Sequence, residues 1–256
     1  MGGNVAAITG GTRGIGRGIA EGFLSSGASV ALFGRSHDKG QLCLKELQAG
    51  ERAAFVAGDA TRREDVEAFI DATVKQHGHL DVVVLNAGAP IPARLADVTD
   101  EDFDYQMRLN FNHVFWGMRR ALRHMIPQGS GRIICISSVE GKTAKASLAI
   151  YTACKHAVHG LVKSTAREVG QHGITVNAIC PGPTMTDAVP EIGPKIAAEW
   201  GIASPEDLFE TWFQESAIKR PNTVQEIAAV AVLLAGESGA GITGSFFNVD
   251  GGIAPY

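Results

Sequence analysis

Residues 5–16 read VAAITGGTRGIG, an apolar run followed at once by a glycine-rich turn. Gly10, Gly14 and Gly16 have the spacing G-x-x-x-G-x-G, which differs from the strict G-x-G-x-x-G of other dinucleotide folds. Residues without a Cβ let the backbone turn sharply and approach a pyrophosphate, whose charge meets the following helix N-terminus. A glycine turn alone is a weak signal. Its position between an expected strand, Val5–Thr9, and an expected helix, Ile15–Ser26, favours a dinucleotide site.

Short apolar runs alternate with stretches of helical period along the rest of the chain. Several runs are apolar throughout, as expected for strands covered on both faces. This alternation predicts right-handed crossovers and an α/β fold, a Rossmann-like, doubly wound parallel sheet of about seven strands with helices on both faces. The predicted strands are Val5–Thr9, Ser29–Phe33, Ala53–Ala57, Asp81–Leu85, Arg132–Ile136, Thr175–Ile179 and Phe246–Val249. The further predicted helices are Asp38–Ala49, Arg63–His77, Asp102–Met125, Tyr151–Gln171 and Val224–Ala235.

We expect one domain over residues 1–256, because no linker, repeat or low-complexity tract interrupts the alternation. The longest departure from it follows Pro181, and a long insertion after a strand is often a functional lid. Residues 184–216 are the lid candidate. Their apolar side chains are either packing faces of two short helices or a cover over an apolar ring or chain: Met185, Ile192, Ile196, Trp200, Leu208, Trp212 and Phe213.

The composition excludes several classes of protein. With 256 residues and a net charge of -4, the chain has no overall basic field for nucleic acid or an acidic membrane surface. The basic cluster Arg119, Arg120, Arg123 and His124 is expected to be a solvated helix face. No apolar run reaches about 18 residues and no signal peptide is evident, so we expect a cytoplasmic protein without a membrane partner.

The cysteines and histidines predict neither disulfides nor a metal. Cys43, Cys135, Cys154 and Cys180 are far apart with no CxxC pair, which is typical of small buried hydrophobic residues in a reduced protein. The histidines lack HExxH spacing, so no metal site is expected.

The end of the second predicted strand, Phe33-Gly34-Arg35-Ser36, bears on the choice of nicotinamide cofactor. NAD-specific enzymes usually place a carboxylate here to bind the ribose 2′-hydroxyl. Gly34 is neutral, and Arg35 offers a planar set of donors to a 2′-phosphate. Arg13 could approach the same phosphate from the glycine turn. The pair favours NADP (NADPH) over NAD, unless both arginines are simply solvated.

At this point the sequence resembles the short-chain dehydrogenase/reductase family over nearly the whole chain, and it is similar to 3-oxoacyl and polyketide ketoreductases and to 3-hydroxybutyrate dehydrogenases. Thirteen residues separate Ser138 from Tyr151, as in that family. The motifs occur in order: TGGTRGIG at 9–16, Asp59, Asn86-Ala87-Gly88, Asn110, Ser138, Tyr151-x-x-x-Lys155 and Pro181-Gly182.

The resemblance implies a set of cofactor-binding residues. Asp59 and the Ala60 amide would contact the adenine, although an aspartate after a strand often only caps a turn. Thr186 would bind the nicotinamide carboxamide. Thr184 stands where the family usually has an aliphatic residue. The full set is Gly10, Thr12, Arg13, Gly14, Ile15, Gly16, Arg35, Ser36, Asp59, Ala60, Asn86, Ala87, Gly88, Tyr151, Lys155, Pro181, Gly182, Thr184 and Thr186.

Four residues form the expected catalytic set. Tyr151 and Lys155 are four residues apart, so they share one face of a helix. A free tyrosine has a pKa of about 10, and a neighbouring ammonium and an oxidised nicotinamide would both lower it. By the resemblance, Lys155 also binds the nicotinamide ribose, Ser138 donates to the substrate oxygen, and Asn110 breaks its helix and holds a water that links Lys155 to solvent.

The substrate is less defined by the sequence. Hydroxybutyrate enzymes hold a carboxylate at the positions of Pro90, Glu140 and Leu148, and Glu140 would repel it. Lys142 would neutralise Glu140 in an alternative that stays open. Glu140 itself either accepts from a substrate hydroxyl or amine, or is solvated on its loop. The candidate substrate residues are therefore Ser138, Glu140 and Tyr151.

The sequence thus predicts an NADP-dependent oxidoreductase that transfers hydride between a nicotinamide and a carbonyl or secondary alcohol carbon, with Tyr151 as general acid/base. The alternatives are an NAD-dependent dehydrogenase of a hydroxy acid such as 3-hydroxybutyrate, and a non-catalytic NADP-binding sensor. The expected signature of a sensor, loss of Tyr151 or Lys155, is absent. The resemblance further implies a homotetramer formed through Asp102–Met125, Tyr151–Gln171 and the C-terminal strand.

Overall fold

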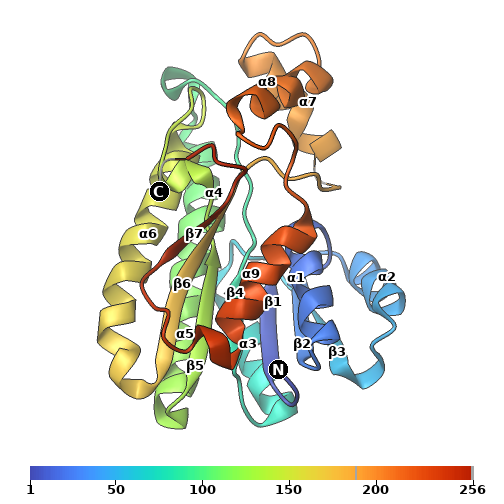
Figure 1. The fold of residues 1–256 in the computed structure, drawn as a ribbon, viewed down its shortest axis with the longest axis vertical. Helices are drawn as coiled ribbons and strands as arrows, with labels where there is room; N and C mark the ends of the chain where they lie inside the picture. Colours follow the sequence, from blue (N-terminus) through green and yellow to red (C-terminus); the bar gives the residue numbers. More distant parts are fainter. Residues whose placement is uncertain (188, 255–256) are drawn as a thin grey trace.

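A single parallel sheet forms the centre of the molecule (Figure 1). The computed structural model describes residues 1–187 and 189–254, without the side chains of Ile192, Pro205 and Phe209. The seven strands have the order β3-β2-β1-β4-β5-β6-β7. They are β1 Val5–Thr9, β2 Ser29–Gly34, β3 Ala53–Ala57, β4 Val82–Leu85, β5 Gly131–Ile136, β6 Ile174–Pro181 and β7 Phe246–Val249. The predicted doubly wound sheet is confirmed, and each predicted strand is present.

The order of the strands reverses between β1 and β4, which are paired in parallel. Chain segments leave the carboxyl ends of these two strands in opposite directions, and ligands of open α/β sheets bind at such a point. β1 and β4 are buried along their whole length, because they are central strands covered on both faces. A ligand site is therefore expected at the residues that directly follow Thr9 and Leu85.

Helices cover both faces of the sheet (Figure 1). The core on one face includes side chains of α3 (Arg63–His77), α5 (His113–Gln128) and α6 (Ala149–Val169). The core on the other face includes side chains of α1 (Gly14–Ser25), α2 (His37–Leu47) and α9 (Val224–Ala235). The four cysteines are buried free thiols, as predicted.

The predicted helix Asp102–Met125 is not one continuous α-helix, and the break at Asn110 that the family resemblance implies is present. It divides into α4 (Asp100–Met107), a π-helical turn over Arg108–Asn112, and α5. Single π-helical turns within α-helices are frequently found at functional sites, and this one contains Asn110. The helical period of the sequence does not reveal such a turn, because the pattern resumes on its far side.

The basic cluster on α5 is largely paired with α3 instead of being solvated as predicted. Arg119 donates to Glu67 at 2.7 Å. Arg120 and His124 both contact the Asp71 carboxylate, with Arg120 Nη2 at 2.6 Å from Asp71 Oδ2. These pairs join two neighbouring helices.

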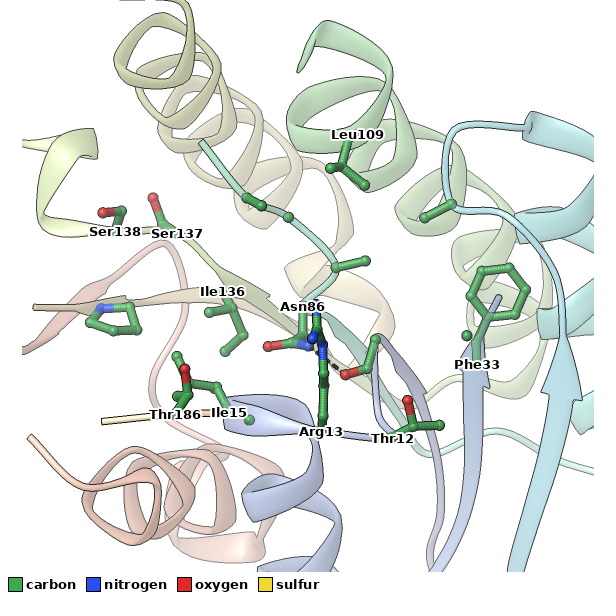
Figure 2. A pocket seen from close by; sticks show the side chains of 18 of the residues that line it. Thr12, Arg13, Ile15, Phe33, Asn86, Leu109, Ile136, Ser137, Ser138 and Thr186 are labelled. Carbon is green, nitrogen blue, oxygen red and sulfur yellow. Dashed lines mark hydrogen bonds between the residues drawn. The ribbon is translucent and has the colours of Figure 1, made fainter. Parts of the chain in front are cut away.

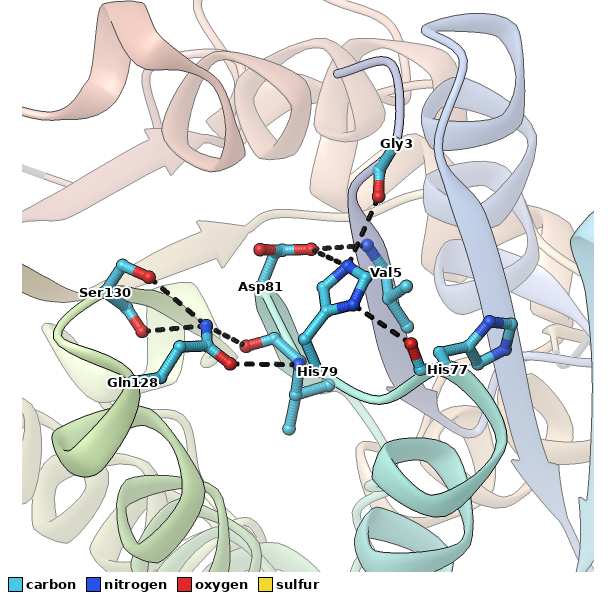
Figure 3. A network of polar contacts seen from close by, with 8 residues as sticks. Gly3, Val5, His77, His79, Asp81, Gln128 and Ser130 are labelled. Carbon is cyan, nitrogen blue, oxygen red and sulfur yellow. Dashed lines mark hydrogen bonds and ion pairs between the residues drawn. The ribbon is translucent and has the colours of Figure 1, made fainter.

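The amino ends of β1 and β4 are held by polar contacts on the side of the sheet away from α7 and α8 (Figures 1 and 3). The Val5 amide donates to Asp81 Oδ2 at 2.7 Å, and His79 Nε2 lies 3.2 Å from the same oxygen. Gln128 bridges Leu80 and Ser130. These contacts fix the adjacent strands, and thereby the alignment of their opposite, carboxyl ends.

The lid candidate forms two short helices, α7 (Val189–Glu199) and α8 (Pro205–Glu215), beyond the carboxyl end of the sheet (Figure 1). Ile196, Ala197 and Leu208 form a small core of their own, with Trp200 and Trp212 packed against it. The predicted packing of two short helices is therefore present. No described helix is long and apolar enough to cross a membrane.

Candidate functional site

A pocket of about 430 Å³ opens at the carboxyl ends of the central strands (Figure 2). Figure 2 shows Thr12, Arg13 and Ile15 on the glycine turn, with Ser138 on the other side of the pocket. The structure brings all the predicted cofactor residues to this pocket except Gly16 and Ser36. Ser36 instead caps α2, because its hydroxyl accepts from the Lys39 amide.

The glycine turn is built so closely that side chains are excluded from it. Gly10 has a φ of +63°, and a Cβ on Gly16 would lie 2.3 Å from the Gly10 carbonyl oxygen. Gly16 therefore allows the close contact between the turn and α1, although it does not itself face the pocket. No described side chain caps the N-terminus of α1. Its first amides can accordingly donate to a pyrophosphate, so the turn fits a dinucleotide.

The two arginines near the pocket differ in their surroundings. Arg13 Nη1 donates to Glu191 Oε1 of α7 at 2.8 Å, so it is not simply solvated. Arg35 is exposed at the rim, next to Gly34. An adjacent carboxylate, Asp59, lines the pocket while its Oδ1 accepts from the Thr61 amide at 2.8 Å. Asp59 thus caps a turn and also faces this pocket.

A buried chain of hydrogen bonds supports the turn after β4. The Thr9 hydroxyl accepts from the amides of Asn86 and Ala87 at 2.9 and 3.1 Å. It lies 3.3 Å from His113 Nε2, while His113 Nδ1 lies 2.6 Å from the Leu109 carbonyl oxygen. Burial lowers the pKa of His113 to about 3, so the ring is neutral: Nδ1–H donates to Leu109, and Nε2 accepts from Thr9. The chain links the π-helical turn to β1.

Asn110 uses its side chain to hold the loop after β4. Its Oδ1 accepts from the Ala89 amide at 3.0 Å, and its Nδ2 donates to the carbonyl oxygens of Ala89 and Gln106. A Cβ on Gly88 would lie 2.9 Å from Asn110 Oδ1 and 3.5 Å from Lys155 Nζ. Asn110 and Lys155 are therefore both neighbours of Gly88, although Asn110 itself does not line the pocket.

Tyr151 and Lys155 both face the pocket from α6. Lys155 Nζ donates to the Ile136 carbonyl oxygen at 2.9 Å and lies 5.3 Å from the centroid of the Tyr151 ring. Burial lowers the pKa of Lys155 to about 8. Lys155 is thus held between the end of β5 and the tyrosine, and is charged at neutral pH.

The pKa of Tyr151 is raised, contrary to the direction expected from its neighbours. Burial is the largest cause, a hydrogen bond with Ser138 opposes it, and the nearby Glu140 raises the pKa further. Positive charges near the phenol would favour the phenolate, but the desolvation of the phenolate outweighs them. At neutral pH Tyr151 is a phenol, which is the form that a proton donor requires.

Ser138 lies at the end of β5, where its Oγ accepts from the Glu140 amide at 3.1 Å. Because this contact uses an oxygen lone pair, the hydroxyl hydrogen stays available for donation. Ser138 lines the first pocket and also a second pocket of about 220 Å³. Tyr151 lines both as well, so the two residues stand where the pockets meet.

Glu140 is buried, with 5% of its surface exposed, so its predicted solvation on the loop is wrong. Burial is the largest cause that raises its pKa, and the charge of Lys145 is the first cause that opposes it. Lys142, the cation suggested by the sequence, instead lies 3.5 Å from the Phe246 carbonyl oxygen. Glu140 lines the second pocket together with Trp200 and Trp212 of the lid candidate.

Residues 4–197 match the family model described as short chain dehydrogenase. The chain belongs to the short-chain dehydrogenase/reductase family. The predicted family resemblance is thus confirmed, and the protein is an oxidoreductase of the kind that acts on hydroxyl or keto groups with a nicotinamide cofactor.

Relatives of this dehydrogenase/reductase differ in their substrates. The chain is 34% identical to 3beta-hydroxysteroid dehydrogenase 2 of Eggerthella lenta, over 100% of this chain and 96% of the relative. It is 33% identical to D-beta-hydroxybutyrate dehydrogenase of Rhizobium meliloti, over 96% and 97% of the two chains. A variant of actinorhodin polyketide ketoreductase, solved with NADPH, superposes with a TM-score of 0.93 at 33% identity, covering 99% of this chain and 98% of the other.

Several residues at the site of this dehydrogenase/reductase are not among those predicted from the sequence. Thr9 and His113 support the turn at Asn86, and Ser137 lines the first pocket while bonded to His159 at 2.8 Å. The only signals were Thr9 directly before Gly10, and Ser137 directly before Ser138. Among the described residues, no group of three or more His, Cys, Asp or Glu side chains could hold a metal ion.

Proposed function

We propose that this protein is an NADP-dependent ketoreductase, which reduces a carbonyl compound with NADPH or oxidises the corresponding secondary alcohol. The observation that carries the proposal is the position of Ser138 and Tyr151 at the junction of two pockets. One pocket has the glycine turn and two arginines suited to a nucleotide, and the other is mostly apolar. A substrate in the second pocket would present its carbonyl group at the open end of the first.

The nicotinamide supplies or accepts the hydride, and the protein handles the proton. In the reduction, the Tyr151 phenol donates its proton to the substrate oxygen as charge develops there. Ser138 donates a hydrogen bond to the same oxygen and stabilises the developing alkoxide. Lys155 holds the nicotinamide ribose and places a positive charge near Tyr151. In the oxidation, Tyr151 as a phenolate would accept the proton of the substrate hydroxyl, and a positively charged nicotinamide nearby would favour that form of the tyrosine.

The cofactor residues proposed from the sequence keep their roles, with two changes. Gly16 and Ser36 shape the site without facing the pocket. Gly16 allows the close contact between the glycine turn and α1, and Ser36 caps the N-terminus of α2. Arg35 and Arg13 would bind the 2′-phosphate. To do so, Arg13 would have to break its contact with Glu191 and form one with the phosphate. Asn110 would hold the loop at Gly88 and a water beside Lys155. Residues 184–216 would act as the lid over the substrate.

The direct test is an NADPH and NADH oxidation assay with ketones, quinones, 3-oxoacyl thioesters and sugars side by side. We expect turnover of one or more apolar ketones, with NADPH preferred. Tight NADPH binding without turnover on the whole panel would favour the sensor instead. Turnover with NADH of 3-oxo acids alone would favour the hydroxy acid dehydrogenase, which the buried Glu140 disfavours.

The contact between Arg13 and Glu191 predicts an effect on cofactor affinity. Glu191→Gln should tighten NADPH binding by about two- to threefold, since an exposed ion pair of modest strength no longer competes for Arg13. The measurement is fluorescence titration with NADPH. Glu199→Gln removes a carboxylate from the same helix and should leave the dissociation constant unchanged. An unchanged constant in Glu191→Gln would show that Arg13 does not bind the phosphate.

The lowered pKa of Lys155 predicts a pH dependence of cofactor binding. Burial favours the neutral amine, so Lys155 is charged below about pH 8 and loses its charge above that. A charged donor contributes ~1 kcal/mol more than a neutral one, so the dissociation constant for NADPH should rise about fivefold between pH 7 and pH 9.5. In Lys155→Met, the dissociation constant for NADPH should be higher than in the unaltered protein and independent of pH. A flat profile in the unaltered protein would contradict the proposal.

A homotetramer is the proposed assembly. Phe103 of α4 and Phe115 of α5 are 43% and 38% exposed, respectively, and apolar side chains at a helix surface are suited to an interface. Light scattering should give a mass of about four chains of 26.9 kDa. A stable monomer at micromolar concentration would contradict this assembly.

A further inference from the structure

Glu140 carries a carboxylate oxygen that the protein leaves without a partner. Oε2 is fully buried and makes no hydrogen bond of normal geometry to a described residue, although the Thr152 hydroxyl and the Lys145 amide are near enough to lower the pKa of the carboxyl. The backbone at Glu140 is fixed, because its amide donates to Ser138 Oγ and the residue sits in a short helical turn, Val139–Gly141. Buried acceptors are nearly always satisfied. An exception at a pocket therefore points to a ligand group that completes it.

The pocket around Glu140 is otherwise mostly apolar. Its apolar lining includes Val139, Leu148, Val189, Ile196, Trp200 and Trp212. Lys145 also lines it, but its Nζ donates to Glu215 Oε2 at 2.6 Å and lies over the Trp200 ring. The lysine is thus directed to the lid helices. Glu140 presents an unsatisfied acceptor inside an apolar enclosure that begins at Ser138 and Tyr151.

The size and charge of the pocket restrict the ligand. Its volume of about 220 Å³ lies below the ~300–1,000 Å³ usual for drug-sized ligands, so it suits a small substrate body. A substrate carboxylate would be repelled by the carboxylate of Glu140. A hydroxyl or N–H group can donate to the ionised carboxylate, and in the protonated form it can donate to the oxygen that does not carry the proton.

We propose that Glu140 selects the substrate by accepting a hydrogen bond from its hydroxyl or N–H group, so that the substrate is a small, otherwise apolar carbonyl compound bearing such a donor away from the reacting carbon. This inference rests on the proposed ketoreductase function. The donor end binds Glu140, the apolar body lies against the lid helices, and the carbonyl reaches Ser138 and Tyr151. Glu140 is then a specificity residue that contacts the substrate without taking part in proton transfer.

The test compares bicyclic ketones that differ in one group: the 5-, 6- and 7-hydroxy-2-tetralones and the three matched methoxy-2-tetralones. A methoxy group accepts hydrogen bonds but does not donate. For at least one isomer, kcat/KM with NADPH should be at least about tenfold higher for the hydroxyl than for the methoxyl compound. Glu140→Leu should bring this ratio close to one, and Glu140→Gln, which keeps an acceptor oxygen, should retain part of it.

Glu215→Gln is the matched control, because it removes a carboxylate that contacts Lys145 but does not line the pocket. It should keep the ratio. Glu140 also raises the pKa of Tyr151, and a purely electrostatic role would change the rates of both compounds equally. An unchanged ratio in Glu140→Leu, or no hydroxyl preference for any isomer, overturns the inference.

Binding separates this inference from the proposed function. Calorimetry with the same compounds, on protein saturated with NADP, reports the hydroxyl preference without turnover. A preference that is lost in Glu140→Leu, without turnover of any ketone, supports the inference and contradicts the ketoreductase. Turnover of hydroxy and methoxy compounds at equal rates supports the ketoreductase and contradicts the inference.

Discussion

Tyr151→Phe should lower the turnover of a ketone by at least about a hundredfold, the lower bound for losing a positioned general acid. Phenylalanine fills the same half-buried space on α6, so the fold and the position of Lys155 should be retained. The lost group is the phenol, whose raised pKa keeps it protonated and able to donate at neutral pH. The measurement is kcat under saturating NADPH.

NADPH affinity, measured on the same Tyr151→Phe preparation, is the control, because the phenol is one of many proposed contacts with the cofactor and its loss should change the dissociation constant little. A dissociation constant within about twofold of the unaltered protein would assign the loss to chemistry. Ser138→Ala should reduce turnover as well, since it removes a donor to the developing alkoxide. If Tyr151→Phe retained its turnover, Tyr151 would have no part in the mechanism.

Arg35→Asp should weaken NADPH binding by about 10- to 100-fold, equivalent to the ~1.5–3 kcal/mol of hydrogen bonds to charged groups. The substitution replaces a planar donor with a carboxylate, which repels a 2′-phosphate and accepts from a 2′-hydroxyl. NADH binding should therefore stay the same or improve. The measurement is a pair of fluorescence titrations with the two cofactors.

Arg63→Asp is the matched control for Arg35→Asp. Arg63 is also exposed, but it does not line the cofactor pocket, so the same change of charge there should leave the preference for NADPH intact. An equal loss in both variants would indicate a general effect of net charge. An unchanged NADPH preference in Arg35→Asp would remove Arg35 from phosphate recognition.

The sheet was predictable because its strands are continuous apolar runs separated by glycines and helical periods. Val5–Thr9, Ala53–Ala57 and Phe246–Val249 have the same bounds in sequence and structure. The break at Asn110 was not predictable from periodicity, because hydrogen bonds of Asn110 with Ala89 and Gln106 accompany it. Such contacts join parts of the chain that the local pattern does not relate.

The residues that gather at the pocket were predictable from motifs, whereas their electrostatics were not. The raised pKa of Tyr151 comes mainly from burial, which depends on everything packed around α6. Likewise, the choice between Lys142 and Lys145 as the neighbour of Glu140 depends on the path of residues 142–148. Arg13 contacts Glu191 across 178 positions of sequence, and no spacing rule anticipates such a pair.

The lid candidate, residues 184–216, belongs to a different part of the chain from Ser138, Tyr151 and Lys155. This separation affects how substrate preference can differ between proteins of this fold. Ser138, Tyr151 and Lys155 are anchored in β5 and α6, while much of the second pocket's apolar wall comes from α7 and α8. Those two helices have their own small core. Segment 184–216 can therefore diverge in sequence while Tyr151, the proposed proton donor, keeps its place. If this segment were exchanged between relatives, substrate preference should follow the segment, and binding at the proposed nucleotide site should be unchanged.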